Sequence, residues 1–383
     1  METTAVGSLV FRMSCRIDFY CGRSQETWSP LSVNTGIGGS QESLMALAAA
    51  LQQLGNTVRI YNTCGSAAGE YSGVVFEDYR AFGRRTPGDV VVVWRFPWNA
   101  EAVPPDTLTY LWMKDMIRPQ AVMQAAHRYS KIFIQSRFHR RYYPDLQEDK
   151  FVYTRNGIVL QHFDQRVERD PYKVVYGSSY DRGLLQLLES WPRIQAKVPQ
   201  AHLTVFYGFD SSRAHAFQLI RPSLESYRRQ NPIKFWGYRR FILAALRQAN
   251  AEHLGRIGHW EVARQFLSAG IWAYPTAFSE TSCITAMKAQ AAGAIPVVIP
   301  SGAVDETVQF GAKTSTSAND YPDRRVPPQV YEEWEALLIS HLQNPAKLEQ
   351  LRAEMAPAAR ERFAWETVAR QWSAEFQRAL GRR

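Results

Sequence analysis

The 383-residue chain has little of what marks secreted, zinc-binding or membrane-spanning proteins. It has only four cysteines, which form neither a Cys-x-x-Cys pair for zinc nor a disulfide framework. Its apolar runs, such as Val90–Trp94, are far shorter than the ~20 residues that cross a bilayer. The first residues include Glu2 and lack the apolar core of a signal peptide. These absences predict a soluble, reduced and cytoplasmic protein without a transmembrane segment.

Hydrophobic residues make up 45% of the chain, which is enough for two domains of ordinary size. Short apolar runs typical of strands alternate with helical patterns, and this alternation predicts parallel α/β layers. Strands are expected at Arg16–Tyr20, Thr57–Tyr61, Asp89–Val93, Lys131–Gln135, Phe151–Tyr153, Val174–Tyr176, Leu203–Tyr207, Ile271–Tyr274 and Ile295–Ile299. Helices are expected at Glu42–Leu54 with Ser40 as its cap, Leu184–Lys197, Trp260–Ser268 and Ile284–Ala292.

Two features divide the chain. The polar stretch Asp164–Lys173 contains a proline and is typical of a linker, and the segment from Pro328 onward is helical, with breaks expected at Pro345 and Pro357. Two doubly wound domains place a cleft between the carboxyl ends of their strands, where open α/β sheets bind ligands.

A glycine-rich loop, Thr35–Glu42, precedes the first expected helix. Glycines allow a ligand to approach the backbone, and a helix N-terminus favours anions. The loop fails the dinucleotide fingerprint, because Gln41 stands where the third glycine is needed and Tyr61-Asn62 supplies no acid. NAD binding is therefore not expected, and a tight turn and a phosphate or sugar site fit the loop equally.

Two further loops carry ligand-binding chemistry. In Tyr274–Cys283, Glu280 could accept hydrogen bonds from sugar hydroxyls while the following helix N-terminus faces a phosphate, although a helix-capping role for Glu280 is the alternative. In Tyr176–Gly183, Arg182 could neutralise a diphosphate, or form an ordinary surface pair with Asp181.

These three loops occur in order with several other segments: Leu111–Asp115, Arg155–Ile158, Gly255–Gly258, Gly302–Thr307 and Trp365–Trp372. Together they resemble the retaining GT-B glycosyltransferases of glycosyltransferase family 4 over nearly the whole chain. The resemblance implies two Rossmann-like, doubly wound domains facing across a cleft, with a C-terminal helix crossing back to the first domain. It implies an acceptor-side domain at 1–168, a nucleotide-sugar-binding domain at 172–357 and the crossing helix at 358–383.

The resemblance also implies metal-independent transfer, with retention, from a UDP- or GDP-linked sugar to an acceptor hydroxyl, and no cofactor. Its catalytic residues would be Glu280, Arg182 and Lys114, with Lys114 facing the reacting carbon. Donor-binding positions would be Gly38, Gly39, Ser178, Arg256, Ile257, Thr281, Ser282, Cys283 and Lys288.

Four positions depart from the family pattern. Lys288 replaces a ribose-binding glutamate, Lys114 a histidine, Gly177 an arginine, and Gln41 an acid. An ammonium group only donates hydrogen bonds, so Lys288 could pair instead with a phosphate or with an acid across the cleft. These changes leave two hypotheses: an unusual donor or acceptor, or a GT-B scaffold without turnover that binds nucleic acid or an anionic surface.

Basic residues are concentrated in two segments. Pro171–Ile257 has 13 lysines and arginines against 5 acids, and Ile117–Pro144 has six against none. Arginines among aromatics suit the binding of nucleic acid or of an anionic membrane, and they equally suit a solvated basic face.

One acceptor hypothesis is DNA with hydroxymethylated pyrimidines; the alternative is a cell-surface polysaccharide or lipid. The expected polyanion contacts are Arg137, Arg140, Arg141, Arg239 and Arg240.

Overall fold

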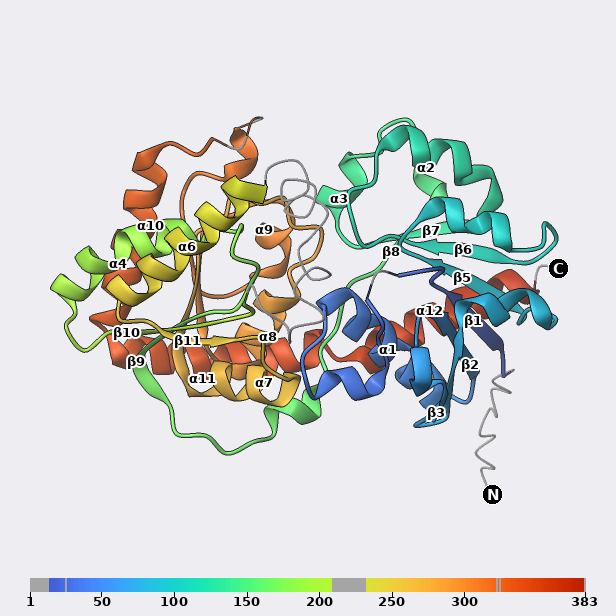
Figure 1. Cartoon of the computed structure of the whole chain (residues 1–383), viewed down its shortest axis with the longest axis horizontal. Helices are drawn as coiled ribbons and strands as arrows, with labels where there is room; N and C mark the ends of the chain where they lie inside the picture. The colour runs from blue at the N-terminus through green and yellow to red at the C-terminus, as the bar shows by residue number, and fades with distance from the viewer. Residues whose placement is uncertain (1–13, 25, 209–231, 322, 324, 382–383) are drawn as a thin grey trace, which may run out of the picture.

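The computed structural model describes residues 14–24, 26–208, 232–321, 323 and 325–381, which form two lobes (Figure 1). The first lobe contains an eight-stranded sheet in the order β3-β4-β2-β1-β5-β6-β7-β8, parallel except for β3. Its strands are β1 Arg16–Tyr20, β2 Thr57–Asn62, β3 Gly69–Tyr71, β4 Val74–Asp78, β5 Val90–Trp94, β6 Thr109–Trp112, β7 Lys131–Ile134 and β8 Phe151–Tyr153. Every residue of β5 is buried, as expected for a strand covered on both faces.

The second lobe contains a parallel six-stranded sheet in the order β11-β10-β9-β12-β13-β14. Its strands are β9 Asp170–Tyr176, β10 His202–Phe206, β11 Glu252–Gly255, β12 Ala269–Tyr274, β13 Ile295–Val298 and β14 Ala312–Lys313. The two parallel-sheet α/β domains predicted from the sequence are therefore present.

Helices cover both sheets (Figure 1). They are α1 Gly39–Gln53, α2 Pro119–Ala125, α3 Arg137–Arg141, α4 Leu184–Lys197, α6 Pro232–Gln248, α7 His259–Ser268, α8 Ile284–Ala292, α9 Val304–Thr307, α10 Pro328–Leu342, α11 Pro345–Arg362 and α12 Trp365–Gly381. Although α12 ends the chain, its buried residues Trp365, Val368, Trp372 and Phe376 belong to the core of the first lobe. The C-terminal helix thus returns to the first lobe, while the predicted domain limits stay a prediction.

Several expected elements need correction. The cap of α1 is Gly38, and Ser40 lies inside the helix. Pro357 lies within α11, and the break falls instead at Phe363-Ala364. The expected linker is shorter than predicted, because Asp170–Lys173 already belongs to β9. The sequence patterns missed the short strands β3, β4, β6, β11 and β14.

The order of strands determines where the lobes can bind a ligand. In the first sheet the chain changes direction between β1 and β5, and in the second between β9 and β12. Loops diverge at such points and leave a crevice at the carboxyl ends of the strands. The loops after these four strands all contribute to one cleft between the lobes.

Candidate active site

The cleft between the lobes has a volume of about 960 Å³ and is lined from both domains. Of the expected site residues, Gly38, Gly39, Lys114, Ser178, Arg182, Glu280, Thr281, Ser282 and Cys283 line it. Lys288, Arg256 and Ile257 do not. The topology thus brings Gly38 and Cys283, which are 245 residues apart in sequence, to the same cleft.

A buried ion pair forms the second-lobe wall. Arg182 Nη1 donates to Glu280 Oε1, and the two residues are only 5% and 6% exposed. The Tyr274 hydroxyl donates to the same oxygen at 2.7 Å, and the guanidinium lies 4.1 Å from the centre of the Phe278 ring. Burial opposes the charge on Arg182, but the Glu280 carboxylate raises the pKa of the guanidinium above its ordinary value.

This pair still has hydrogen-bonding capacity. Arg182 Nε and Nη2 are buried and have no hydrogen-bond partner among the described residues. Gly183 follows at φ +95°, where a Cβ atom would lie 2.3 Å from the Pro275 carbonyl oxygen, so the turn requires glycine. The backbone therefore fixes Arg182 with unsatisfied donors at the cleft, where they suit an anionic ligand.

Two helices begin at the cleft. Gly38 is the N-cap of the 15-residue α1 and Cys283 that of the nine-residue α8. A Cβ on Gly39 would lie 3.0 Å from Ile284 Cδ1, so the two helix starts approach each other closely. Their free amide groups and dipoles add to the charge of Arg182 at the same place.

Lys114 lies on the first-lobe wall but is held by its own domain. Its Nζ donates to Ser43 Oγ (2.7 Å) and Asn156 Oδ1 (2.6 Å) and lies 4.0 Å from the centre of the Trp112 ring. Burial lowers the pKa of this amine well below its ordinary value. Its contacts are those of a residue that fixes the wall, and the catalytic role stays a prediction.

Lys288 pairs across the two lobes with an acid, one of the two partners that the sequence left open. Its Nζ donates to Glu42 Oε2 at 2.8 Å, and His259 Nδ1 lies 2.9 Å from Glu42 Oε1. All three residues are less than 10% exposed. Burial acts to raise the pKa of Glu42, but the charges of His259 and Lys288 hold it well below its usual range. The cluster therefore connects α1 to α7 and α8 as a buried ionic contact.

The loop expected to receive a nucleobase packs against the first lobe. Arg256 Nη2 contacts Glu26 Oε1 at 3.1 Å, and a Cβ on Gly36 would lie 2.6 Å from the Ile257 carbonyl oxygen. Gly36 has φ +94°, so both the backbone and the close approach require glycine there. Arg256 does not line the cleft, whereas its partner Glu26 does.

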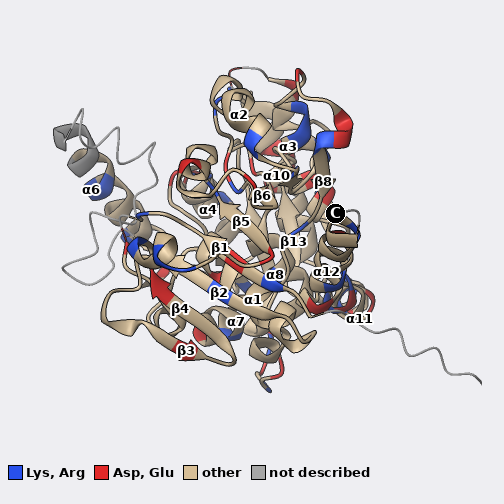
Figure 2. Cartoon of the chain, turned by 90° about the vertical axis from the view of Figure 1, so that its right-hand side faces the viewer, with Lys and Arg blue, Asp and Glu red and all other residues tan. Residues whose placement is uncertain are grey.

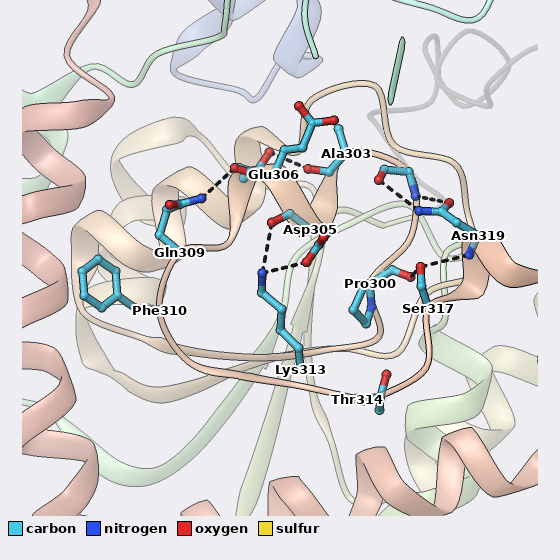
Figure 3. Close-up of polar contacts among 12 residues, drawn as sticks. Pro300, Ala303, Asp305, Glu306, Gln309, Phe310, Lys313, Thr314, Ser317 and Asn319 are labelled. Atoms are coloured by element: carbon cyan, nitrogen blue, oxygen red, sulfur yellow. Dashed lines mark hydrogen bonds and ion pairs between the residues drawn. The ribbon is translucent and has the colours of Figure 1, made fainter. Parts of the chain in front are cut away.

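Other contacts also join the lobes. Ser136 Oγ donates to the Thr281 carbonyl oxygen at 2.8 Å. In turn, Thr281 Oγ1 donates to the Lys114 carbonyl oxygen at 2.9 Å. Figure 3 shows the segment Pro300–Asn319, in which Asp305 pairs with Lys313 while the Glu306 side chain stands away from α9. The Glu306 carboxylate accepts the backbone amides of Arg137 (2.9 Å) and Phe138 (2.7 Å).

None of the five arginines expected to contact a polyanion lines the cleft. Arg140 already has partners within the first lobe, since it pairs with Glu148 at 2.9 Å and donates to the carbonyl oxygens of Tyr143 and Leu146. Acidic and basic stretches of the ribbon lie next to each other around α3 (Figure 2). Arg137 and Arg141 are exposed on α3, Arg239 and Arg240 lie on α6, and residues 226–231 are outside the described part of the chain.

Sequence reasoning missed two cleft residues with unusual backbones. Arg95 has φ +75° and Tyr207 has φ +112°, conformations that glycine favours. They directly follow β5 and β10, and both line the cleft. Strained non-glycine residues cluster at binding sites. Arg95 lies two residues after the expected strand Asp89–Val93, but Tyr207 was placed at the end of the expected strand Leu203–Tyr207, and the strain of neither residue has a signal in the sequence.

No group of three or more histidines, cysteines, aspartates or glutamates among the described residues is placed to hold a metal ion. None of their helices is both long and apolar enough to span a membrane.

Two doubly wound domains that face each other across a ligand cleft, with the last helix on the first domain, define a GT-B fold. The chain has this fold, and solved glycosyltransferases are similar to it over nearly its whole length. Sucrose-phosphate synthase from Thermosynechococcus elongatus is 13% identical, with a TM-score of 0.70, 96% of this chain covered and 100% of that one. HepE from Anabaena, in complex with UDP-glucose, is 12% identical, with a TM-score of 0.66, and the match covers 95% of this chain and 100% of HepE. AviGT4, a glycosyltransferase involved in avilamycin A biosynthesis, is 14% identical, with a TM-score of 0.63, and the match covers 96% of this chain and 99% of AviGT4.

No protein-family model and no curated protein sequence matches the chain. The likeness is therefore one of fold.

Proposed function

We propose that the protein is a metal-independent, retaining glycosyltransferase that moves a sugar from a UDP- or GDP-linked donor to an acceptor hydroxyl. The observation that carries this proposal is the buried Arg182–Glu280 pair at the helix N-termini of the interdomain cleft. A solved structure of similar fold, HepE, is in complex with UDP-glucose. The intact pair favours an enzyme over a scaffold without turnover.

Donor binding would exchange the partners of this pair. Glu280 would accept hydrogen bonds from hydroxyls of the donor sugar in place of Arg182. Arg182 would then donate to the diphosphate with Nη1 and with the buried, unpartnered Nε and Nη2. Gly38, Gly39 and the Thr281–Cys283 backbone would bring amide groups to the same phosphates.

The transfer step needs no covalent enzyme intermediate. The acceptor oxygen forms a bond to the anomeric carbon as the bond from that carbon to the β-phosphate oxygen breaks. The acceptor proton passes to the departing phosphate oxygen on the same face, which gives retention. Negative charge grows on the diphosphate, and preorganised donors such as Arg182 stabilise it most when water is excluded.

The first lobe would present the acceptor. The cleft has no excess of basic residues: Arg23, Arg95, Lys114 and Arg182 stand against the acids Glu26, Asp115, Asp181 and Glu280. A polyanion needs an excess of cations along its path. We therefore favour an uncharged acceptor over DNA with hydroxymethylated pyrimidines.

Thermal stabilisation by UDP, GDP, ADP and CMP and their sugar conjugates tests the donor. A nucleotide at 100 times its dissociation constant adds about 2.7 kcal/mol to stability, which is a clear shift. We expect one nucleoside diphosphate to stabilise the protein and its sugar conjugate to stabilise it further. No shift from any of them would contradict the proposal.

Glu280→Gln tests the role of the carboxylate. The amide has nearly the same shape, so nucleotide binding should persist while transfer falls about 100-fold or more. Asp305→Asn is the matched control, because that carboxylate pairs with Lys313 outside the cleft. Product formation is measured by mass spectrometry and by nucleotide release. Undiminished turnover of Glu280→Gln would refute the assignment.

A further inference from the structure

A second hollow, of about 480 Å³, lies on the first lobe between the 3-10 turn Pro97–Ala102 and α2. The residues that line it include Trp98, Ala100, Glu101, Gln124, His127 and Arg128. None of these residues lines the main cleft. The hollow has both an apolar surface and side chains that can bond to hydroxyls.

Two stacked aromatic rings connect the hollow to the cleft. Phe96 lines the cleft and Trp98 lines the hollow. Their ring centres are 5.0 Å apart and their planes differ by 18°. Trp98 is 50% exposed, although large aromatic side chains are usually buried. The stack therefore offers a flat apolar face directly beside the candidate active site.

The backbone holds this stack in place. Arg95, at φ +75°, pairs with Asp115 (Nη2 to Oδ1, 3.2 Å), and its guanidinium lies 5.2 Å from the centre of the Phe96 ring. Asn99 Nδ2 donates to the Cys21 carbonyl oxygen at 3.1 Å. Strain of this kind persists only where the surrounding structure enforces it, and it is typical of binding sites.

We propose that the Phe96–Trp98 stack and the adjoining hollow bind the non-reacting sugars of an oligosaccharide acceptor whose terminal hydroxyl lies in the cleft. This inference rests on the proposed transferase function. A pyranose ring presents a face of C–H bonds that packs on an aromatic ring, with its hydroxyls at the edge. Glu101, Gln124 and His127 line the hollow and offer acceptors and donors for such hydroxyls.

The charges of the hollow favour a neutral glycan over nucleic acid. Glu101 would repel a phosphate backbone. Arg128 Nη2 already donates to the carbonyl oxygens of Ala100 (3.1 Å) and Val103. Phosphate binding depends on several available lysines or arginines, and these walls do not provide them.

Trp98→Ala tests the site, with Trp260→Ala as the matched control. Trp260 is 48% exposed on α7 of the second lobe and lines neither the cleft nor the hollow. Wild type and variants are applied to a microarray of neutral mono- and oligosaccharides, with single-stranded and hydroxymethylcytosine DNA on the same surface. Glycans that are retained are then titrated by calorimetry.

Wild type and Trp260→Ala should retain oligosaccharides more strongly than monosaccharides. Trp98→Ala should bind them at least about tenfold more weakly, and Trp98→Phe should recover part of the loss. Equal retention by Trp98→Ala, no glycan retained by wild type, or preferential retention of DNA would each overturn the proposal. Thermal stabilisation by UDP and by GDP is measured in parallel with glycan binding. No stabilisation by either nucleotide would refute the transferase function, whereas weak glycan binding with intact nucleotide stabilisation refutes only the acceptor site.

Discussion

Single buried side chains determine how this protein responds to acid, as His162 illustrates. It is 7% exposed, beside Trp260 and His259, with ring centres 4.8 and 6.2 Å away. Burial lowers its pKa from 6.5 to about 4. Between pH 4 and pH 6.5 this histidine is therefore protonated more often in the unfolded chain than in the folded one. Stability therefore falls as the pH drops below 6.5 and stops falling near pH 4, a loss of about 3 kcal/mol.

His162→Phe should remove this loss, because phenylalanine cannot be protonated. We expect the urea midpoint of the variant to change less between pH 7 and pH 4.5 than that of the wild type. His202→Gln is the control, since the His202 side chain is 48% exposed. If His162→Phe and wild type have the same pH slope, burial of His162 is not the cause.

The sequence could reveal the chemistry of a residue but not its partner. Glu280 and Arg182 were recognisable from their loops, and both line the cleft. Their contact joins positions 98 apart in sequence and depends on how β9 and β12 pair. Lys288 was seen to need an anionic partner, but Glu42 is 246 positions away in the other lobe and could not be identified.

At the scale of the element, α12 shows how a late helix stabilises an early domain. Trp372 is fully buried, stacks on Phe133 with ring centres 3.7 Å apart, and donates from Nε1 to Thr154 Oγ1 at 2.8 Å. Truncation of a buried tryptophan to alanine costs about 3–5 kcal/mol. We expect Trp372→Ala to destabilise the first lobe by this amount.

Trp372→Phe separates packing from hydrogen bonding, because it keeps a ring against Phe133 and loses the bond to Thr154. Its cost should be nearer 1–2 kcal/mol. Hydrogen exchange resolved by peptide should show faster exchange in β7 and β8 of Trp372→Ala and little change in β10. Uniform destabilisation of both lobes would contradict this assignment.

Elements with a strong pattern could be predicted from sequence, and very short polar ones could not. The amphipathic α4 and the five-residue strand β1 have the bounds that their patterns predict. The three-residue β8 (Phe-Val-Tyr) is wholly apolar and was also predicted, whereas β3 (Gly-Glu-Tyr) and β14 (Ala-Lys) are too short and too polar to show a pattern. Pro357 was expected to end a helix, yet α11 continues through it to Arg362. Tertiary packing outweighs the local preference there, since Met355 and Ala359 on either side are buried.

At the scale of the whole molecule, the relative position of the lobes depends on buried polar contacts rather than on a shared apolar core. The buried hydrophobic residues of the second lobe form one cluster, which also includes Ile158 and Phe163 from the segment after β8, and those of the first lobe with α12 form two others. The cluster of Glu42, His259 and Lys288 joins the lobes close to Gly38 and Gly39 of the cleft. Its ionic state should therefore determine how firmly the cleft is closed.

Glu42→Gln removes the only carboxylate within this cluster and leaves Lys288 and His259 buried without it. Breaking a buried pair in this way costs about 3–5 kcal/mol, part of which the lobes can recover by separating. We expect a lower melting temperature and a larger radius of gyration by small-angle scattering. Asp89→Asn, which breaks an exposed pair within the first lobe, should cost less than about 1 kcal/mol.

The same contact should weaken in acid. Because the folded-state pKa of Glu42 lies well below the ordinary 4.5, the stability it contributes is fully present above that pH and is lost progressively below it. A double-mutant cycle combines Glu42→Gln with Lys288→Gln. The summed stability losses of the two single variants should exceed the stability loss of the double variant by about 1–3 kcal/mol at pH 7, and by less at pH 4. Additive losses at pH 7 would show that Glu42 and Lys288 act independently, and a constant coupling between pH 7 and pH 4 would show that the Glu42 carboxylate does not control it.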